Sequence, residues 1–241
     1  MALFSRRRKR DEPADTPAAV DAPGTTADEQ PAAEPAPDRG PWDVTHVPEL
    51  GTRIDLGALR VPARPGLKLR MEVEKKTGKV VATSISVAGS ALQVQAFAAP
   101  RTQGLWDELR PEIAASVEKQ GGTADEVDGP FGRELLARLP VTTPEGRSGH
   151  RPARFLGVDG PRWFLRGVIS GRAAIDPDAA ARLEELFADV VVVRGTEPRA
   201  PRDVLHLTLP TTSDAATEET AATDEPDFDP TRRGPEITEI R

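Results

Sequence analysis

The sequence predicts an α+β domain built on an antiparallel sheet of about six strands that two amphipathic helices cover. In several short segments apolar and polar residues alternate, as they do in strands with one face against a core. In two longer segments the apolar residues recur every three or four positions, which is typical of amphipathic helices. The predicted strands are grouped before each helix, whereas a parallel α/β sheet would alternate single strands with helices.

Three consecutive strands are predicted at residues 67–74, 80–87 and 91–99. In the first, apolar side chains occupy every second position, at Leu67, Leu69, Met71 and Val73. Gly78 lies in the short link to the second strand, where its freedom to adopt positive φ favours a hairpin turn. Such a meander is expected to keep one face of the sheet against the core and the other against solvent.

The segment ahead of this meander has weaker patterning. Residues 53–61 show two brief alternations and predict a short strand or edge segment. Residues 42–52 are expected to form an irregular entry segment that packs through Trp42 and Leu50.

The first helix is predicted where apolar residues recur every four positions, at Leu105, Leu109, Ile113 and Val117. Pro111 lies inside this stretch and is expected to kink the helix or to mark a fresh start. Gly121 and Gly122 are expected to end it, because glycine readily adopts the left-handed conformation that follows a helix.

The second helix is predicted to begin at Asp176, an N-cap residue that Pro177 follows at the first helical position. Residues 190–194 either continue this helix or form a short strand. A last extended piece is predicted at residues 205–209, where leucine alternates with other residues.

The sequence between the two predicted helices also shows the alternation typical of strands. Residues 126–139 predict strands interrupted at Gly129-Pro130, residues 141–150 a polar loop, and residues 151–171 a β-hairpin around an Asp-Gly-Pro turn. Successive strand side chains face opposite sides of a sheet. One side of the hairpin should therefore carry Trp163, Leu165 and Ile169, and the other Arg162, Phe164 and Arg166.

Composition divides the 241-residue chain into residues 1–40, 41–212 and 213–241. The two flanking parts contain few large apolar residues, so they cannot bury enough surface to offset the entropy of ordering and are expected to be disordered. The last part is acidic, with nine acidic and three basic side chains. The middle part is nearly neutral, which gives no reason to expect a nucleic-acid surface on it.

Several chemistries are excluded or unsupported by residue content. The chain has no cysteine, so it forms no disulfide, thiol nucleophile or cysteine-ligated zinc site. It has neither of the glycine-rich phosphate-binding motifs, so a standard nucleotide site is not expected. No cofactor is predicted. It has no apolar run long enough to span a bilayer and no pattern typical of a signal peptide, and we therefore expect a cytoplasmic protein.

Five segments carry a resemblance to a known family: Leu59-Arg60-Val61-Pro62, Ala98-Ala99-Pro100-Arg101, Gly104-Leu105-Trp106, Asp128-Gly129-Pro130-Phe131-Gly132-Arg133-Glu134-Leu135 and Gly157-Val158-Asp159-Gly160-Pro161-Arg162-Trp163. Over residues 42–210 the chain resembles an uncharacterised actinobacterial family, domain of unknown function 3710. The resemblance implies a cytosolic actinobacterial protein with a basic N-terminus, and it implies no catalytic residues. The predicted order of elements also resembles the PsbP/Mog1-like sandwich, a fold that commonly serves in binding or assembly.

Five arginines are candidates for an anion or acidic-peptide site: Arg133, Arg151, Arg154, Arg162 and Arg166. If they converge on one region of the sheet, their guanidinium groups suit bidentate contacts with a carboxylate or phosphate. The alternative is that they pair with acidic neighbours such as Glu134 and Asp159 on a solvated face.

A second candidate is the basic cluster Arg6, Arg7, Arg8, Lys9 and Arg10, which follows Leu3 and Phe4. Such a cluster would give weak, reversible contact with an anionic membrane or a nucleic acid. The alternative is a basic leader with neither role.

Acid–base and metal chemistry have little support. His46, His150 and His206 fall in three separate elements, without the spacing of a metal site. Asp128 and Asp159 each precede a glycine, where aspartate is first a turn residue.

The leading hypothesis is therefore a non-enzymatic cytosolic binding or scaffold module with a protein partner. One alternative is a small-anion or acidic-peptide receptor, or an enzyme, that uses the hairpin arginines. Contact with a membrane or nucleic acid through the basic N-terminus is another.

Overall fold

A computed structural model describes residues 38–101, 104–142, 146 and 148–210. Its strands are β1 (Trp42–Asp43), β2 (Arg53–Asp55), β3 (Leu59–Pro62), β4 (Lys68–Val73), β5 (Val80–Val87), β6 (Ser90–Ala98), β7 (Thr123–Gly129), β8 (Gly132–Thr142), β9 (Ser148–Gly160), β10 (Trp163–Ser170) and β11 (Val191–Val192). Its helices are α1 (Trp106–Lys119), α2 (Pro177–Ala188) and the short 3₁₀ helix η1 (Arg172–Ala174).

The strands form a large and a small sheet. The large sheet has the order β4-β5-β6-β10-β9-β8-β7, and all its neighbouring strands are antiparallel. The small sheet has the order β1-β11-β3-β2, in which β1 runs parallel to β11. The predicted α+β class is confirmed. The large sheet has seven strands rather than about six, and β2 and β3 belong to a second sheet that the sequence patterning did not predict.

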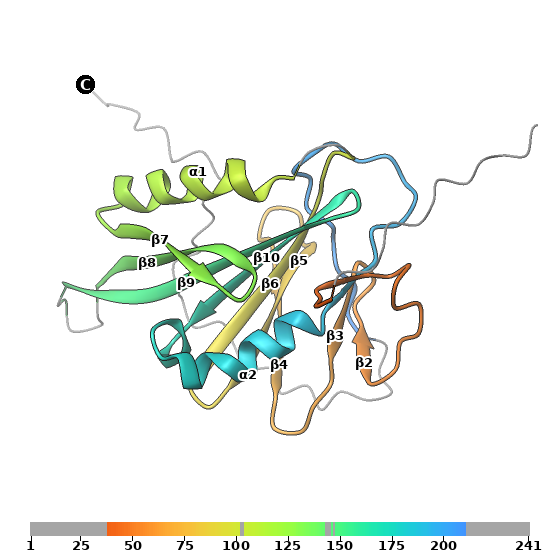
Figure 1. Ribbon diagram of the computed structural model, residues 1–241, viewed down its shortest axis with the longest axis horizontal. Helices are drawn as coiled ribbons and strands as arrows, with labels where there is room; N and C mark the ends of the chain where they lie inside the picture. Colours follow the sequence, from red (N-terminus) through yellow and green to blue (C-terminus); the bar gives the residue numbers. More distant parts are fainter. Residues whose placement is uncertain (1–37, 102–103, 143–145, 147, 211–241) are drawn as a thin grey trace, which may run out of the picture. The chain divides into compact units, whose positions relative to one another are not determined.

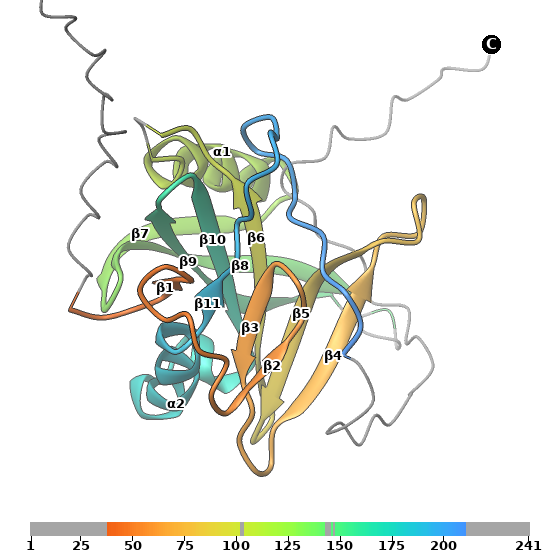
Figure 2. The same ribbon diagram turned by 90° about the vertical axis from the view of Figure 1, so that its right-hand side faces the viewer.

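The two helices cover opposite faces of the large sheet (Figure 1). The alternation predicted along β10 is confirmed, since Trp163 and Leu165 pack in the core cluster that contains the α2 side chains. Phe164 packs in the other cluster, where its ring lies 5.8 Å from that of Trp106 on α1. The small sheet lies on the α2 side, next to that helix (Figure 2), and contributes Leu59 and Val192 to the same cluster.

Local sequence signals set the ends of both helices. Asp176 caps α2, and its carboxylate accepts the backbone N–H groups of Asp178 and Ala179 at 3.0 and 3.3 Å, as predicted. Helix α1 ends as predicted at Gly121, which has a φ of 83°. The N–H of Gly122 then donates to the carbonyl of Val117 at 2.9 Å.

Two predictions about local structure were wrong. Pro111 lies on the exposed side within the continuous helix α1, so of its two predicted effects the fresh start is excluded. Leu50 is 38% exposed and is not part of the buried core. The loop predicted at residues 141–150 is shorter, because Val141 pairs with Gly149 and extends the β8–β9 ladder.

The end of the described chain connects the two sheets. Val191 and Val192 form a short strand, which settles the alternative left open for residues 190–194. Leu207 then makes β-bridges to Gly57, beside the small sheet, and to Val80 of β5. Of the flanking parts predicted to be disordered, residues 1–37, which include Arg6–Arg10, and residues 213–241 lie outside the described residues. Residues 38–40 are described, and Gly40 is buried.

Candidate functional site

The residues of the hairpin motif at 157–163 contribute to packing and helix capping. A Cβ atom on Gly157 would lie 2.1 Å from the ring of Trp106, and one on Gly160 would lie 2.1 Å from the ring of Trp163. Asp159 caps α1 from β9, since its carboxylate accepts the N–H groups of Leu105 at 2.7 Å and Trp106 at 3.1 Å. These positions therefore have structural roles.

The five candidate arginines do not meet at one place. Arg154 pairs across the strands with Ile169, on the α2 face. Arg166 is 6% exposed, lies on the opposite face with Phe164, and donates to the Gln95 side chain at 2.5 Å. The five arginines therefore do not form a single anion site.

The other three candidates also lie apart. Arg133 is exposed and pairs with Asp128 at 3.0 Å and Glu126 at 3.3 Å. Arg151 lies opposite Leu139 near the far end of β9. Arg162 occupies the β9–β10 turn with a φ of 64°, and it is the candidate that lies beside further cations.

A buried charged cluster surrounds Arg154. Its guanidinium bonds the carboxylate of Glu184 on α2, and its Nε lies 3.4 Å from a carboxylate oxygen of Glu134. Glu134 is 1% exposed, and burial raises its pKa to about 7. Arg154 opposes this rise and Glu184 adds to it. Gly129 leaves the room that Glu134 needs, because a Cβ there would lie 2.1 Å from the Glu134 carboxyl carbon.

Glu134 can therefore exchange a proton near neutral pH, but its burial keeps it away from solvent and from a dissolved substrate. Of the two aspartates considered as acids, Asp159 caps α1 and Asp128 pairs with Arg133. The described part of the chain contains no group of three or more His, Asp or Glu residues placed to hold a metal ion.

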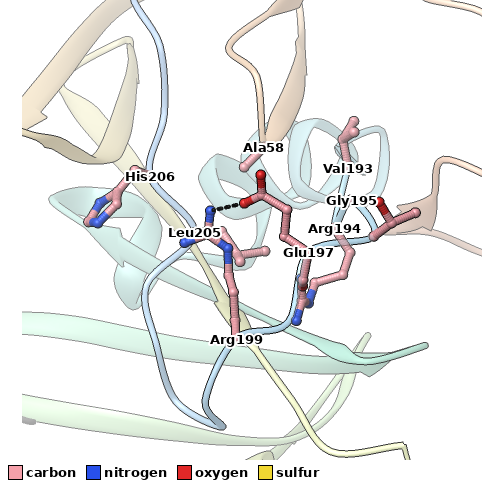
Figure 3. A pocket seen from close by; sticks show the side chains of 9 residues that line it. Ala58, Val193, Arg194, Gly195, Glu197, Arg199, Leu205 and His206 are labelled. Carbon is pink, nitrogen blue, oxygen red and sulfur yellow. Dashed lines mark hydrogen bonds and ion pairs between the residues drawn. The ribbon is translucent and has the colours of Figure 1, made fainter.

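A surface hollow of about 360 Å³ opens where the small sheet ends (Figure 3). We call it the basic hollow. Its walls come from the start of β3, the segment after β11, and the last extended segment of the domain. It is lined by Ala58, Val193, Arg194, Gly195, Thr196, Glu197, Arg199, Leu205 and His206.

Arg194 is the partly buried cation of this hollow. Its Nε donates to the carbonyl of Arg162 at 3.0 Å, and its Nη1 donates to the carbonyl of Glu197 at 3.1 Å. Both acceptors are neutral, and among the described residues Arg194 has no carboxylate partner. Burial lowers the pKa of Arg194 below its ordinary value, and the charges of Arg162 and Arg199 lower it further.

Among the described residues, the other charged side chains that line the hollow are Arg199 and Glu197. Arg199 lies 3.5 Å from Glu197, the one carboxylate among the described lining residues, and the Glu197 side chain is 78% exposed. An ion pair so exposed is weak. The Nε2 atom of His206 lies 3.5 Å from Nζ of Lys79.

Burial lowers the pKa of His206, and the charges of Lys79 and Arg199 lower it further, while Glu74 and Asp203 oppose them. The imidazole is therefore mainly neutral at pH 7. The net charge at the hollow is positive, because its arginines outnumber the carboxylate that lines it. Such an arrangement offers an anion several N–H donors at once.

Neither Arg194 nor Arg199 was predicted as a site residue from the sequence. A usable signal was present, because both arginines follow the apolar run Val190–Val193 within six residues. Polar groups directly after a buried strand often lie at an edge of the core, where ligands have access.

The fold and this site define an α+β domain with a cationic surface hollow. The chain belongs to the family described as "Protein of unknown function (DUF3710)", whose model matches residues 40–216. A comparison with curated proteins gives no match. The family resemblance found in the sequence is confirmed, whereas the actinobacterial source, the PsbP/Mog1-like topology and the cytoplasmic location stay predictions. Neither helix of the described part is long and apolar enough to cross a membrane.

Proposed function

We propose that this domain is a non-catalytic binding module that recognises an acidic side chain of a partner protein in the basic hollow. The observation that carries the proposal is the state of Arg194, which is partly buried and hydrogen-bonded to carbonyl groups alone among the described residues. A guanidinium that has lost part of its hydration is stabilised when a carboxylate supplies the missing counter-charge.

The size and walls of the hollow favour a side chain over a large ligand. Its volume of about 360 Å³ is near the lower end for ligand sites. The partly exposed Val193 offers apolar surface to the methylene groups of a glutamate, beside the guanidinium of Arg194 that would bind its carboxylate. The described lining has no aromatic side chain other than His206 on which a nucleic-acid base would stack.

The proposal is tested by fluorescence anisotropy, with the full chain and a labelled hexaglutamate peptide as the probe. We expect saturable binding that weakens as salt is added, because screening reduces the attraction between exposed charges. Labelled hexalysine is the control for non-specific association and should not bind. Absence of hexaglutamate binding would overturn the proposal.

Two variants locate the binding in the hollow. Arg194→Gln and Arg199→Gln should each weaken hexaglutamate binding at least tenfold, since each removes a charged donor. The matched control is Arg182→Gln, which removes the same charge from an exposed position on α2 and should leave the affinity unchanged. Arg199 pairs with the exposed Glu197 alone among described residues, so its variant keeps the test valid if Arg194→Gln does not fold. Equal losses in all three variants would contradict the proposed site.

A further inference from the structure

The basic hollow lies close to the point where the described chain ends. His206 lines the hollow, and Thr208 donates its N–H to the carbonyl of Leu56 at 2.9 Å. Leu56 is two residues from Ala58, which forms another wall of the hollow. The described chain ends at Pro210, four residues beyond His206, so Pro210 lies within about 14 Å of the hollow along the chain.

The sequence that follows is the most acidic part of the chain. Between residues 211 and 231 it has no basic side chain. Its carboxylates are Asp214, Glu218, Glu219, Asp224, Glu225, Asp227 and Asp229. We call residues 218–229, which hold six of them, the acidic segment.

The acidic segment is within reach of the hollow. Seven residues lie between Pro210 and Glu218, and the eight Cα–Cα steps that join the two residues span at most about 28 Å. A ligand tethered by so short a linker has an effective concentration of about a millimolar. Weak intrinsic affinity is enough for substantial occupancy at that concentration.

We propose that the acidic segment, residues 218–229, occupies the basic hollow of its own chain and competes there with the acidic partner. The proposal rests on the proposed function, because it uses the same cationic site. The acidic segment is then an internal ligand whose charge is opposite to that of the hollow, and a partner must displace it. The affinity measured for a partner is then lower than the intrinsic affinity of the hollow, by the fraction of molecules in which the hollow is open.

The test uses a full-length variant whose acidic segment is neutralised by six substitutions: Glu218→Gln, Glu219→Gln, Asp224→Asn, Glu225→Gln, Asp227→Asn and Asp229→Asn. We expect labelled hexaglutamate to bind this variant about tenfold more tightly than the natural chain. Adding Arg199→Gln to the variant should remove that gain. Adding Arg182→Gln, the matched control on α2, should not.

The outcomes separate this proposal from the proposed function. Equal binding to the natural and neutralised chains, still lost with Arg199→Gln, would overturn the internal ligand and leave the binding function in place. No binding to either chain would overturn both. Tighter binding that is independent of Arg199 would place the effect outside the hollow and also overturn the proposal.

A second measurement does not depend on an added peptide. The carboxylates of a docked acidic segment lie near His206, so they stabilise its protonated form and raise its pKa. We expect NMR titration to show a lower pKa for His206 in the neutralised variant than in the natural chain at low salt. His150, on the distant β8–β9 hairpin, is the internal reference. The proposal would be overturned if the difference in pKa between His206 and His150 were the same in the neutralised variant and in the natural chain.

Discussion

Trp163 donates its indole N–H to a carboxylate oxygen of Asp43 at 2.7 Å, although 120 positions separate the two residues in the chain. The other carboxylate oxygen of Asp43 accepts the N–H and hydroxyl of Thr45 at 2.9 and 2.7 Å. Trp163 is 1% exposed, so this bond is shielded from water. It connects the first strand of the small sheet to a central strand of the large one.

Replacing Trp163 should destabilise the domain in two separable ways. Trp163→Phe keeps most of the packing but leaves a buried Asp43 oxygen without its donor, which should cost about 1–3 kcal/mol. Trp163→Ala also leaves a cavity and should cost about 3–5 kcal/mol. Urea unfolding measures both. Asp43→Ala should cost less in the Trp163→Phe background than alone, and additive costs would show that the bond contributes nothing.

The stability of the domain should depend on the protonation of Glu134. Burial raises the pKa of this carboxyl from an ordinary 4.5 to about 7, so the folded state holds the proton more tightly than the unfolded chain. The resulting stabilisation is fully present below about pH 4.5, falls as the pH rises to about 7, and is absent above that. The change is on the order of 3 kcal/mol.

Glu134→Gln isolates this contribution because glutamine keeps the shape and does not titrate. Unfolding free energies of the two proteins should be measured by urea titration between pH 4.5 and 8. The variant should gain stability relative to the natural chain as the pH rises through this window. A difference between the two proteins that does not change with pH would contradict the prediction.

The two Asp-Gly-Pro turns should respond differently to the same substitution. Asp159→Ala removes the acceptor of two backbone N–H groups at the start of α1 and should cost about 1–2 kcal/mol. Asp128→Ala removes an exposed ion pair with Arg133 and should change the unfolding free energy by less than about 0.5 kcal/mol. Thermal unfolding followed by circular dichroism compares them. Equal effects would show that Asp159 is not a cap.

Strand β9 contains a matched pair of glycines. Gly157→Ala places a methyl group against the ring of Trp106 and should cost about 1–3 kcal/mol or more. Gly149→Ala, on the same strand, finds its nearest contact at 3.9 Å and should be tolerated. Tryptophan fluorescence during urea unfolding reports on both. A stable Gly157→Ala protein would mean that α1 can move away from β9.

Much of the fold was predictable because its signals are local. The alternation in β4 to β6, the N-cap at Asp176 and the glycine end of α1 depend on residues that are close in sequence. The small sheet was missed because strands of two to four residues are too short to show a period. The pairing of Trp42 with Val191 is also too distant in sequence for a local pattern to reveal.

The candidate site was harder to predict than the fold. Arg151 and Arg154 are three residues apart on one strand, so alternation alone places them on opposite faces. The five arginines are close in sequence, but the alternation of side chains along a strand separates them between the two faces of the sheet. The hollow itself depends on the carbonyl of Arg162, in the β9–β10 turn, lying within reach of Arg194. Contacts of this kind between distant turns have no sequence period.

The pairing of β1 with β11 and the two bridges of Leu207 also restrict when the domain can fold during synthesis. The strands β4 to β6 can pair as they leave the ribosome, because each lies next to its successor in the chain. The small sheet must wait until residue 192 has been added, and its connection to the large sheet until Leu207 has emerged. Until then the apolar face that α2 and the small sheet will cover is exposed, and exposed apolar surface of this kind makes a partly folded chain prone to aggregation.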